Sequence, residues 1–202
     1  MITLNHLSMK TALIFSSLLL SGSLMMKKPI TDAAAGSTTV VKTAKKSKRV
    51  SSPMPKGAVK IIVDKSSYEL YVYDSEGWYA TYPVVFGNNS LEDKKMEGDK
   101  NTPEGTFRII SKRVHEKWER FMGLDYPTKE SLERFNMRKK RGEIPSHAKP
   151  GGAIGLHGTW PNDDFMIDRY KNWTNGCISL KNIDIDELYS YVPVGTPITI
   201  RK

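Results

Sequence analysis

Short strand-forming runs separated by turn residues dominate the chain from residue 59 onward, and they constrain the fold more than any other feature. Residues 59–63 form a continuous apolar run, and residues 68–86 contain two runs with alternating faces joined by a tight turn. A Thr-Pro-Glu-Gly sequence at 102–105 favours a turn that starts a further strand at 106–110. Alternation with a period of two indicates strands with one buried face, so we expect a mainly β domain.

Two helices are expected within this β pattern. Thr128 can cap a helix from Lys129 to about Arg141, and Asn182 can cap a helix that Pro193 ends. Between the helices, glycines and prolines precede a strand at 153–157, and a last strand is expected at 196–201. The sequence contains no internal repeat, no phosphate-binding glycine loop and no dinucleotide fingerprint, so no pattern indicates nucleotide use.

The length of 202 residues suits one domain with flanking segments. Residues 1–28 are typical of an export signal, or of an anchor if uncleaved, because Lys10 precedes an apolar run that contains serines and a glycine. Residues 29–56 are expected to be a flexible basic linker. Residues 57–202 then form the domain, with a basic insert at about 111–150.

The net charge of +9 belongs mostly to the first segments of the chain. Residues 1–56 hold nine of the 31 basic residues and one of the 22 acids, so the domain itself is nearly neutral. Nucleic-acid binding requires a basic stripe on a folded surface, and the basic residues here lie in a Ser/Thr-rich stretch. We therefore expect no nucleic-acid partner, and contact with a membrane only through an uncleaved N-terminal segment.

Cys177 is the single cysteine of the chain, which excludes a disulfide framework and multi-cysteine metal sites. One interpretation is a buried inert thiol, since free cysteine is commonly buried. The other is a nucleophile, because Gly176 precedes it and His157 ends a predicted strand, where catalytic groups are often displayed. A metal site built from His157, Cys177 and one nearby aspartate lacks paired ligand spacing, and we expect neither metal nor cofactor.

These residues resemble the L,D-transpeptidase family with the YkuD-type catalytic domain. The resemblance rests on His157-Gly158, then fifteen residues, then Thr174-Asn175-Gly176-Cys177-Ile178. It extends upstream to the strand pattern from residue 61 and the turn at 102–105, and downstream to 182–198, so that it covers about residues 57–202. It implies a mixed β-sandwich or barrel. Asn175 stands where most members have histidine, and Ser179 where many have arginine.

The resemblance implies a cysteine-dependent L,D-transpeptidase that acts on peptidoglycan stem peptides through a thioester. Cys177 would be the nucleophile and His157 its base, oriented by the carbonyl of Gly158. Oxyanion and substrate contacts would come from Gly176, Asn175, Thr174, Trp173 and Ser179. The acceptor would be an amine of a second stem peptide or of an envelope protein lysine, and the location the periplasm or cell envelope.

Two other functions stay open at this point. The departures at Asn175 and Ser179, together with a similarity to a murein hydrolase-like sub-branch of the family, allow an L,D-carboxypeptidase or hydrolase of the same peptides or of protein–peptidoglycan links. A catalytically silent wall-binding module is the alternative from a different class. Adduct formation at Cys177 distinguishes the enzymes from the binding module.

Overall fold

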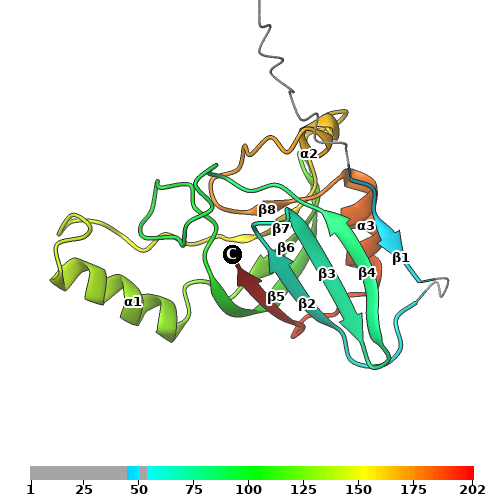
Figure 1. Cartoon of the computed structure of the whole chain (residues 1–202), viewed down its shortest axis with the longest axis horizontal. Coiled ribbons are helices and arrows are strands. Elements are labelled where there is room, and N and C mark those ends of the chain that lie inside the picture. Colours follow the sequence, from blue (N-terminus) through cyan, green and yellow to red (C-terminus); the bar gives the residue numbers. More distant parts are fainter. Residues whose placement is uncertain (1–44, 51–53) are drawn as a thin grey trace, which may run out of the picture. The chain divides into compact units, whose positions relative to one another are not determined.

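The computed structural model describes residues 45–50 and 54–202 of the chain. The predicted signal and most of the predicted linker lie outside these residues. Within the described part, nine strands form one sheet in the order β1-β4-β3-β2-β9-β5-β6-β7-β8 (Figure 1). The strands are β1 Lys48–Arg49, β2 Lys60–Asp64, β3 Glu69–Asp74, β4 Gly77–Pro83, β5 Gly105–His115, β6 Glu119–Leu124, β7 Gly155–His157, β8 Ile178–Ser179 and β9 Pro197–Arg201.

The strand pairings agree with the expected mainly β architecture. β2, β3 and β4 form an antiparallel meander, β9 pairs parallel with β2, and β5 pairs antiparallel with β9. β7 and β8 pair in parallel at the other end of the strand order. Val85, just after β4, forms an antiparallel bridge to Ser179 in β8, with N–O distances of 2.9 and 3.0 Å. This bridge connects the β4 segment back to the far edge of the sheet, which curls it toward a barrel.

Alternating side chains of these strands supply the core. Ile61, Val63, Leu70 and Val72 project inward from β2 and β3 and are almost completely buried. The inward residues of the other strands and the apolar stripe of α3 complete the same cluster. The period-two pattern of the sequence therefore corresponds to the buried face of the sheet.

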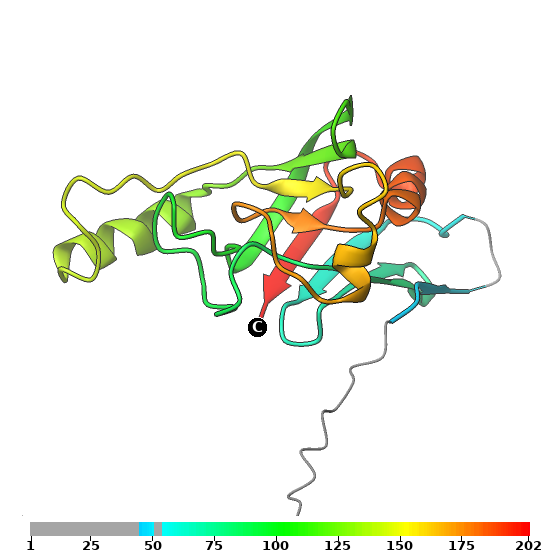
Figure 2. The ribbon, with the colours of Figure 1, turned by 90° about the horizontal axis from the view of Figure 1, so that it is seen from above.

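Three helices accompany the sheet in the described residues: α1 Lys129–Lys140, α2 Phe165–Asp168 and α3 Asn182–Tyr191. Figures 1 and 2 show α1 and α3 on opposite sides of the strands. Thr128 caps α1 as expected, its Oγ1 accepting a hydrogen bond from the backbone N–H of Ser131. None of the described helices is long and apolar enough to cross a membrane.

The expected role of Asn182 as a helix cap is wrong. Lys181 holds the N-cap position of α3, and Asn182 is the first helical residue. The backbone N–H of Asn182 instead donates to Oδ1 of Asp164, at 3.0 Å. Asp164 at the start of α2 therefore satisfies a free N–H group that a cap within α3 would otherwise serve.

The predicted basic insert is partly a component of the sheet. β5 continues to His115, and β6 lies between β5 and β7 in the sheet. The inward residues Phe121, Met122 and Leu124 are buried, whereas the charged residues of the segment lie along β5, around the connecting turn and on α1. The many charged residues of this segment gave no indication of β6, which is stabilised by pairing with β5 on one side and β7 on the other.

The predicted flexible linker also requires correction over residues 45–50. Lys48 and Arg49 form β1, an added edge strand on β4. Lys45 pairs with Glu69 at 3.0 Å, and Arg49 pairs with Glu187. The basic residues thus lie against acids of the domain that are far away in sequence, which local composition cannot indicate.

Candidate active site

His157 ends β7 and is 2% exposed. Its Nδ1 lies 2.7 Å from the carbonyl oxygen of Gly158. Since a carbonyl only accepts, Nδ1 carries the proton and Nε2 remains available as an acceptor. The backbone therefore fixes the tautomer that a general base needs.

Aromatic rings surround the imidazole of His157. Trp118, from the turn between β5 and β6, stacks on it with a centroid distance of 4.7 Å and an interplanar angle of 27°. Phe121 stacks at 6.3 Å, and Trp173 makes an edge contact at 5.5 Å. The ring of His115 also stacks on Trp118, with a centroid distance of 4.4 Å. These contacts restrict the ring to one orientation.

Burial lowers the pKa of His157 to about 4. The hydrogen bond to Gly158 opposes this change, and the electrostatic effect of His115 adds to it. The imidazole is therefore neutral at physiological pH and able to accept a proton.

Cys177 lies directly before β8, and the strand register brings it close to the histidine. β7 and β8 run in parallel, pairing Leu156 with Ile178 and His157 with Ser179. The thiol donates to the carbonyl oxygen of Ala153, with a sulfur–oxygen distance of 3.5 Å. Burial raises the pKa of the thiol, while a backbone hydrogen bond from Gly155 and the charge of Lys94 act in the opposite direction.

Cys177 and His157 line one cavity of about 490 Å³, which we call the catalytic cleft. Its walls are mainly apolar and include several aromatic rings. Its lining residues are Arg113, Trp118, Phe121, Gly152, Ala153, Ile154, His157, Trp160, Trp173, Thr174, Asn175 and Cys177. An apolar cavity with a few convergent polar groups is the usual form of a small-ligand site.

The loop that presents Cys177 is closed by Thr174. The hydroxyl of Thr174 donates to the carbonyl of Cys177 at 2.7 Å and accepts from the N–H of Gly176 at 3.1 Å. Gly176 has φ of +122°, and a Cβ there would lie 2.9 Å from the carbonyl oxygen of Asn101. Only glycine meets both conditions.

The predicted site residues occupy three kinds of position. Trp173, Thr174 and Asn175 line the catalytic cleft, with Asn175 exposed. The N–H of Gly176, an expected oxyanion donor, is occupied by Thr174. Ser179, expected to contact substrate, is fully buried, and its hydroxyl donates to the carbonyl of Gly158 at 3.3 Å. Ser179 therefore contacts the group that orients His157, not the cleft.

Sequence reasoning missed Trp118, Phe121 and Arg113 as lining residues of the cleft. All three come from the segment interpreted as a basic insert. The available signal was the pair of aromatic residues, Trp118 and Phe121, within a strongly charged stretch.

Within the described residues, no three His, Cys, Asp or Glu side chains come together as a metal site. Asp164, one of the aspartates near His157 in the sequence, accepts hydrogen bonds from the hydroxyl of Thr159 and the N–H of Asn182. These hydrogen bonds connect the loop after β7 to the start of α3, so Asp164 has a structural role.

The curled β sheet, with a cleft lined by His157 at the end of β7 and Cys177 before β8, has a YkuD-type fold. The sequence profile of the YkuD L,D-transpeptidase catalytic domain matches residues 58–200, and the chain belongs to this family. It is 26% identical over 153 residues to the Bacillus subtilis protein named "Putative L,D-transpeptidase YqjB", covering 74% of each chain.

Among solved structures, the chain is similar to the helical cell shape determining protein Pgp2 from Campylobacter jejuni. The identity is 20% and the TM-score 0.50, and the match covers 72% of this chain and 48% of Pgp2. A single-residue mutant of Pgp2 matches with a TM-score of 0.52 at 19% identity, covering 72% of this chain and 47% of the mutant. The chain thus spans about half the length of these proteins, and the likeness shows the fold.

Proposed function

We propose that the protein is a cysteine-dependent L,D-transpeptidase that acts on peptidoglycan stem peptides through a thioester acyl-enzyme. The observation that carries this proposal is that Cys177, directly before β8, and His157, at the end of the adjoining parallel strand β7, line one cleft while Nδ1 of His157 is hydrogen-bonded to Gly158. Membership in the YkuD family supports the substrate class.

In the first step, Sγ of Cys177 attacks the carbonyl carbon of the L-centre of the stem diamino residue. Nε2 of His157 takes the thiol proton and delivers it to the amine of the terminal D-amino acid, which leaves as the peptide bond breaks. In the second step, an amine of another stem peptide or of a protein lysine attacks the thioester. It forms a new amide bond, and its proton passes through His157 back to the sulfur.

Both groups start this reaction uncharged. Burial raises the pKa of the Cys177 thiol and lowers that of His157, so a thiolate–imidazolium pair is disfavoured in the free protein. Proton transfer therefore accompanies the attack, and the thiol must turn from the carbonyl of Ala153 toward His157.

The oxyanion would be stabilised first by the backbone N–H of Cys177 and the exposed side-chain amide of Asn175. The N–H of Gly176 becomes available only when its bond to Thr174 breaks. Removing one such donor typically costs about 10²–10³ in rate.

Product analysis tests the proposal. The full chain is incubated with a stem tetrapeptide and a second D-amino acid, and the products are identified by mass, with Cys177→Ala as the control. We expect exchange of the terminal residue. Shortening of the peptide without exchange would replace the transpeptidase with a hydrolase, and no change with the wild-type protein would contradict both.

The proposed substrate also requires export to the cell envelope. The predicted signal at residues 1–28 supports this location. Fusing these residues to a reporter that matures only after export tests it directly, and a reporter retained in the cytoplasm would contradict it.

A further inference from the structure

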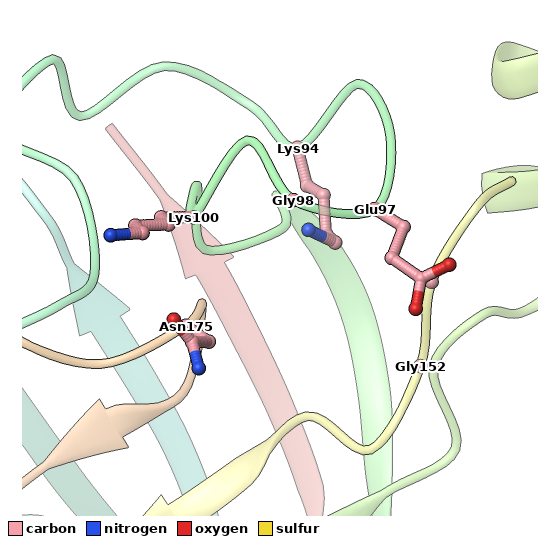
Figure 3. A pocket seen from close by; sticks show the side chains of 7 residues that line it. Lys94, Glu97, Gly98, Lys100, Gly152 and Asn175 are labelled. Carbon is pink, nitrogen blue, oxygen red and sulfur yellow. The ribbon is translucent and has the colours of Figure 1, made fainter. Parts of the chain in front are cut away.

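Figure 3 shows a second cavity, of about 330 Å³, which adjoins the catalytic cleft. We call it the side pocket. The two cavities share the lining residues Gly152 and Asn175, and Asn175 lies two residues before Cys177. A group bound in the side pocket would therefore be close to the reacting carbonyl.

Lys94 supplies a buried ammonium group to the side pocket, and it is 5% exposed. Its Nζ donates to the carbonyl of Met96 at 3.0 Å and to Oδ1 of Asp99 at 2.8 Å. An ammonium has three N–H donors, and among the described residues Nζ of Lys94 has acceptors for two of them. Since a buried donor without an acceptor is costly, the third N–H is suited to an anionic group of a ligand.

The loop that carries Lys94 is fixed by Asp99. The carboxylate of Asp99 accepts from the backbone N–H groups of Lys95, Met96 and Asn101, at 2.6 to 3.0 Å. The ammonium of Lys94 is therefore held in place before any ligand binds, which reduces the entropy lost on binding.

Glu97 supplies the opposite charge to the side pocket. Its backbone N–H donates to the carbonyl of Lys149 at 2.8 Å, while its exposed carboxylate forms no ion pair with any described residue. Figure 3 shows this carboxylate directed toward the Gly152 segment. The lining of the side pocket thus carries the ammonium groups of Lys94 and Lys100 and the carboxylate of Glu97, and Asp99 pairs with Lys94 at 2.8 Å, so both signs of charge are present.

Glycines leave room for a ligand between these charges. A Cβ built on Gly98 or Gly152 would have no atom within 4 Å. A purely anionic ligand would meet Glu97, and a purely cationic one would meet Lys94. A group that carries an ammonium and a carboxylate on the same carbon fits both.

We propose that the side pocket binds the free amino-acid end of the substrate's diamino side chain, with Lys94 on its carboxylate and Glu97 on its ammonium. This assignment rests on the proposed function, since it places the side chain of the residue whose carbonyl Cys177 attacks. Asn175 lines both cavities, so it would lie between the scissile carbonyl in the catalytic cleft and the side-chain end in the side pocket.

Binding is measured by titration calorimetry on the full chain carrying Cys177→Ala, so that no turnover is needed. Two tetrapeptides are compared, one with meso-diaminopimelate and one with lysine, which lacks the side-chain carboxylate. We expect about tenfold tighter binding of the diaminopimelate peptide, the usual scale for a hydrogen bond to a charged group. Equal affinities would overturn the proposal.

Three substitutions in the same background assign the contacts. Lys94→Gln should abolish the discrimination between the peptides. Glu97→Gln should weaken binding of the diaminopimelate peptide severalfold. When the side-chain amine of that peptide is acetylated, the substitution should have no effect on its affinity. Lys95 lies on the same loop, pairs with Glu92 at 3.0 Å and does not line the pocket, so Lys95→Gln is the matched control and should change neither affinity.

The experiments distinguish a failure of the pocket assignment from a failure of the proposed function. If Lys94→Gln fails to fold, as its melting curve would show, the Glu97→Gln arm still decides the question, and an unchanged affinity there contradicts the assignment. Discrimination by the Cys177→Ala protein without turnover by the wild type would retain the pocket and reject the reaction. Turnover of both peptides with equal affinity would do the reverse.

Discussion

The indole of Trp118 stacks on the imidazole of His157, with ring centroids 4.7 Å apart, and the backbone carbonyl of Trp118 accepts the N–H of Gly158 at 2.9 Å. One residue of the β5–β6 turn thus contacts both the ring of the proposed base and the residue that orients it. The rest of the proposed mechanism depends on how well this arrangement is maintained.

Replacing Trp118 should impair the base. Trp118→Ala opens one face of His157 to water, so the pKa of the imidazole should rise from about 4 toward its ordinary value of 6.5. We expect kcat/KM to fall about tenfold or more and its acidic limb to move to higher pH, whereas Trp118→Phe keeps most of the activity. Trp78, which is 42% exposed on β4, provides the control Trp78→Ala. An unmoved acidic limb in Trp118→Ala would contradict this role.

The thiol should be a poor nucleophile toward small reagents at neutral pH. Burial raises the pKa of Cys177 above its ordinary value of 9.0, so the thiolate is scarce in the free protein until the pH exceeds that value. The rate of iodoacetamide alkylation, followed by intact mass from pH 6 to 10, should climb throughout this range. A plateau reached below pH 7 would reveal a preformed thiolate and contradict concerted proton transfer.

Gly176 should tolerate no side chain. Gly176→Ala combines an unfavourable φ of +122° with a Cβ 2.9 Å from a backbone oxygen, so we expect a loss of about 2 kcal/mol or more in the free energy of unfolding. Denaturant titration measures this change. Gly152→Ala is the matched control, since its Cβ meets no atom within 4 Å and should leave stability within about 0.5 kcal/mol. Equal stability of the two variants would refute the constraint.

The β1 segment should stabilise the domain through Asp184. The hydroxyl of Ser47 donates to Oδ1 of Asp184 at 2.6 Å, and Asp184 is 5% exposed, with its pKa raised by burial. Ser47→Ala leaves that buried carboxylate without its donor, so we expect a loss of about 1–2 kcal/mol. Lys46→Ala, an exposed change in the same segment, should have little effect in the same denaturant titration. If both variants unfold alike, β1 does not contribute through this contact.

The sequence predicted the strands and helices that local patterns determine. The alternation at 68–86 became β3 and β4, and the cap at Thr128 begins α1. The family resemblance implied a site shared by His157 and Cys177, and both residues line the catalytic cleft, beside the parallel pair β7 and β8.

What the sequence did not predict depends on contacts between distant segments. β1 is stabilised by the β4 edge and by acids of β3 and α3, and β6 by pairing with β5 and β7, so neither has a strong signal of its own. The family resemblance implied that Ser179 contacts the substrate. Strand alternation instead turns its side chain inward, toward the carbonyl of Gly158.

The central claim is that Cys177 is an acylating nucleophile served by His157, and intact-mass analysis with a carbapenem tests it most directly. The strained β-lactam carbonyl is an acyl donor that a competent thiol should open. We predict that the wild-type protein gains one inhibitor mass, mapped by digestion to the peptide containing Cys177, that His157→Ala acylates far more slowly, and that Cys177→Ala gains nothing. An unmodified wild-type protein, or an adduct that persists in Cys177→Ala, would contradict the account.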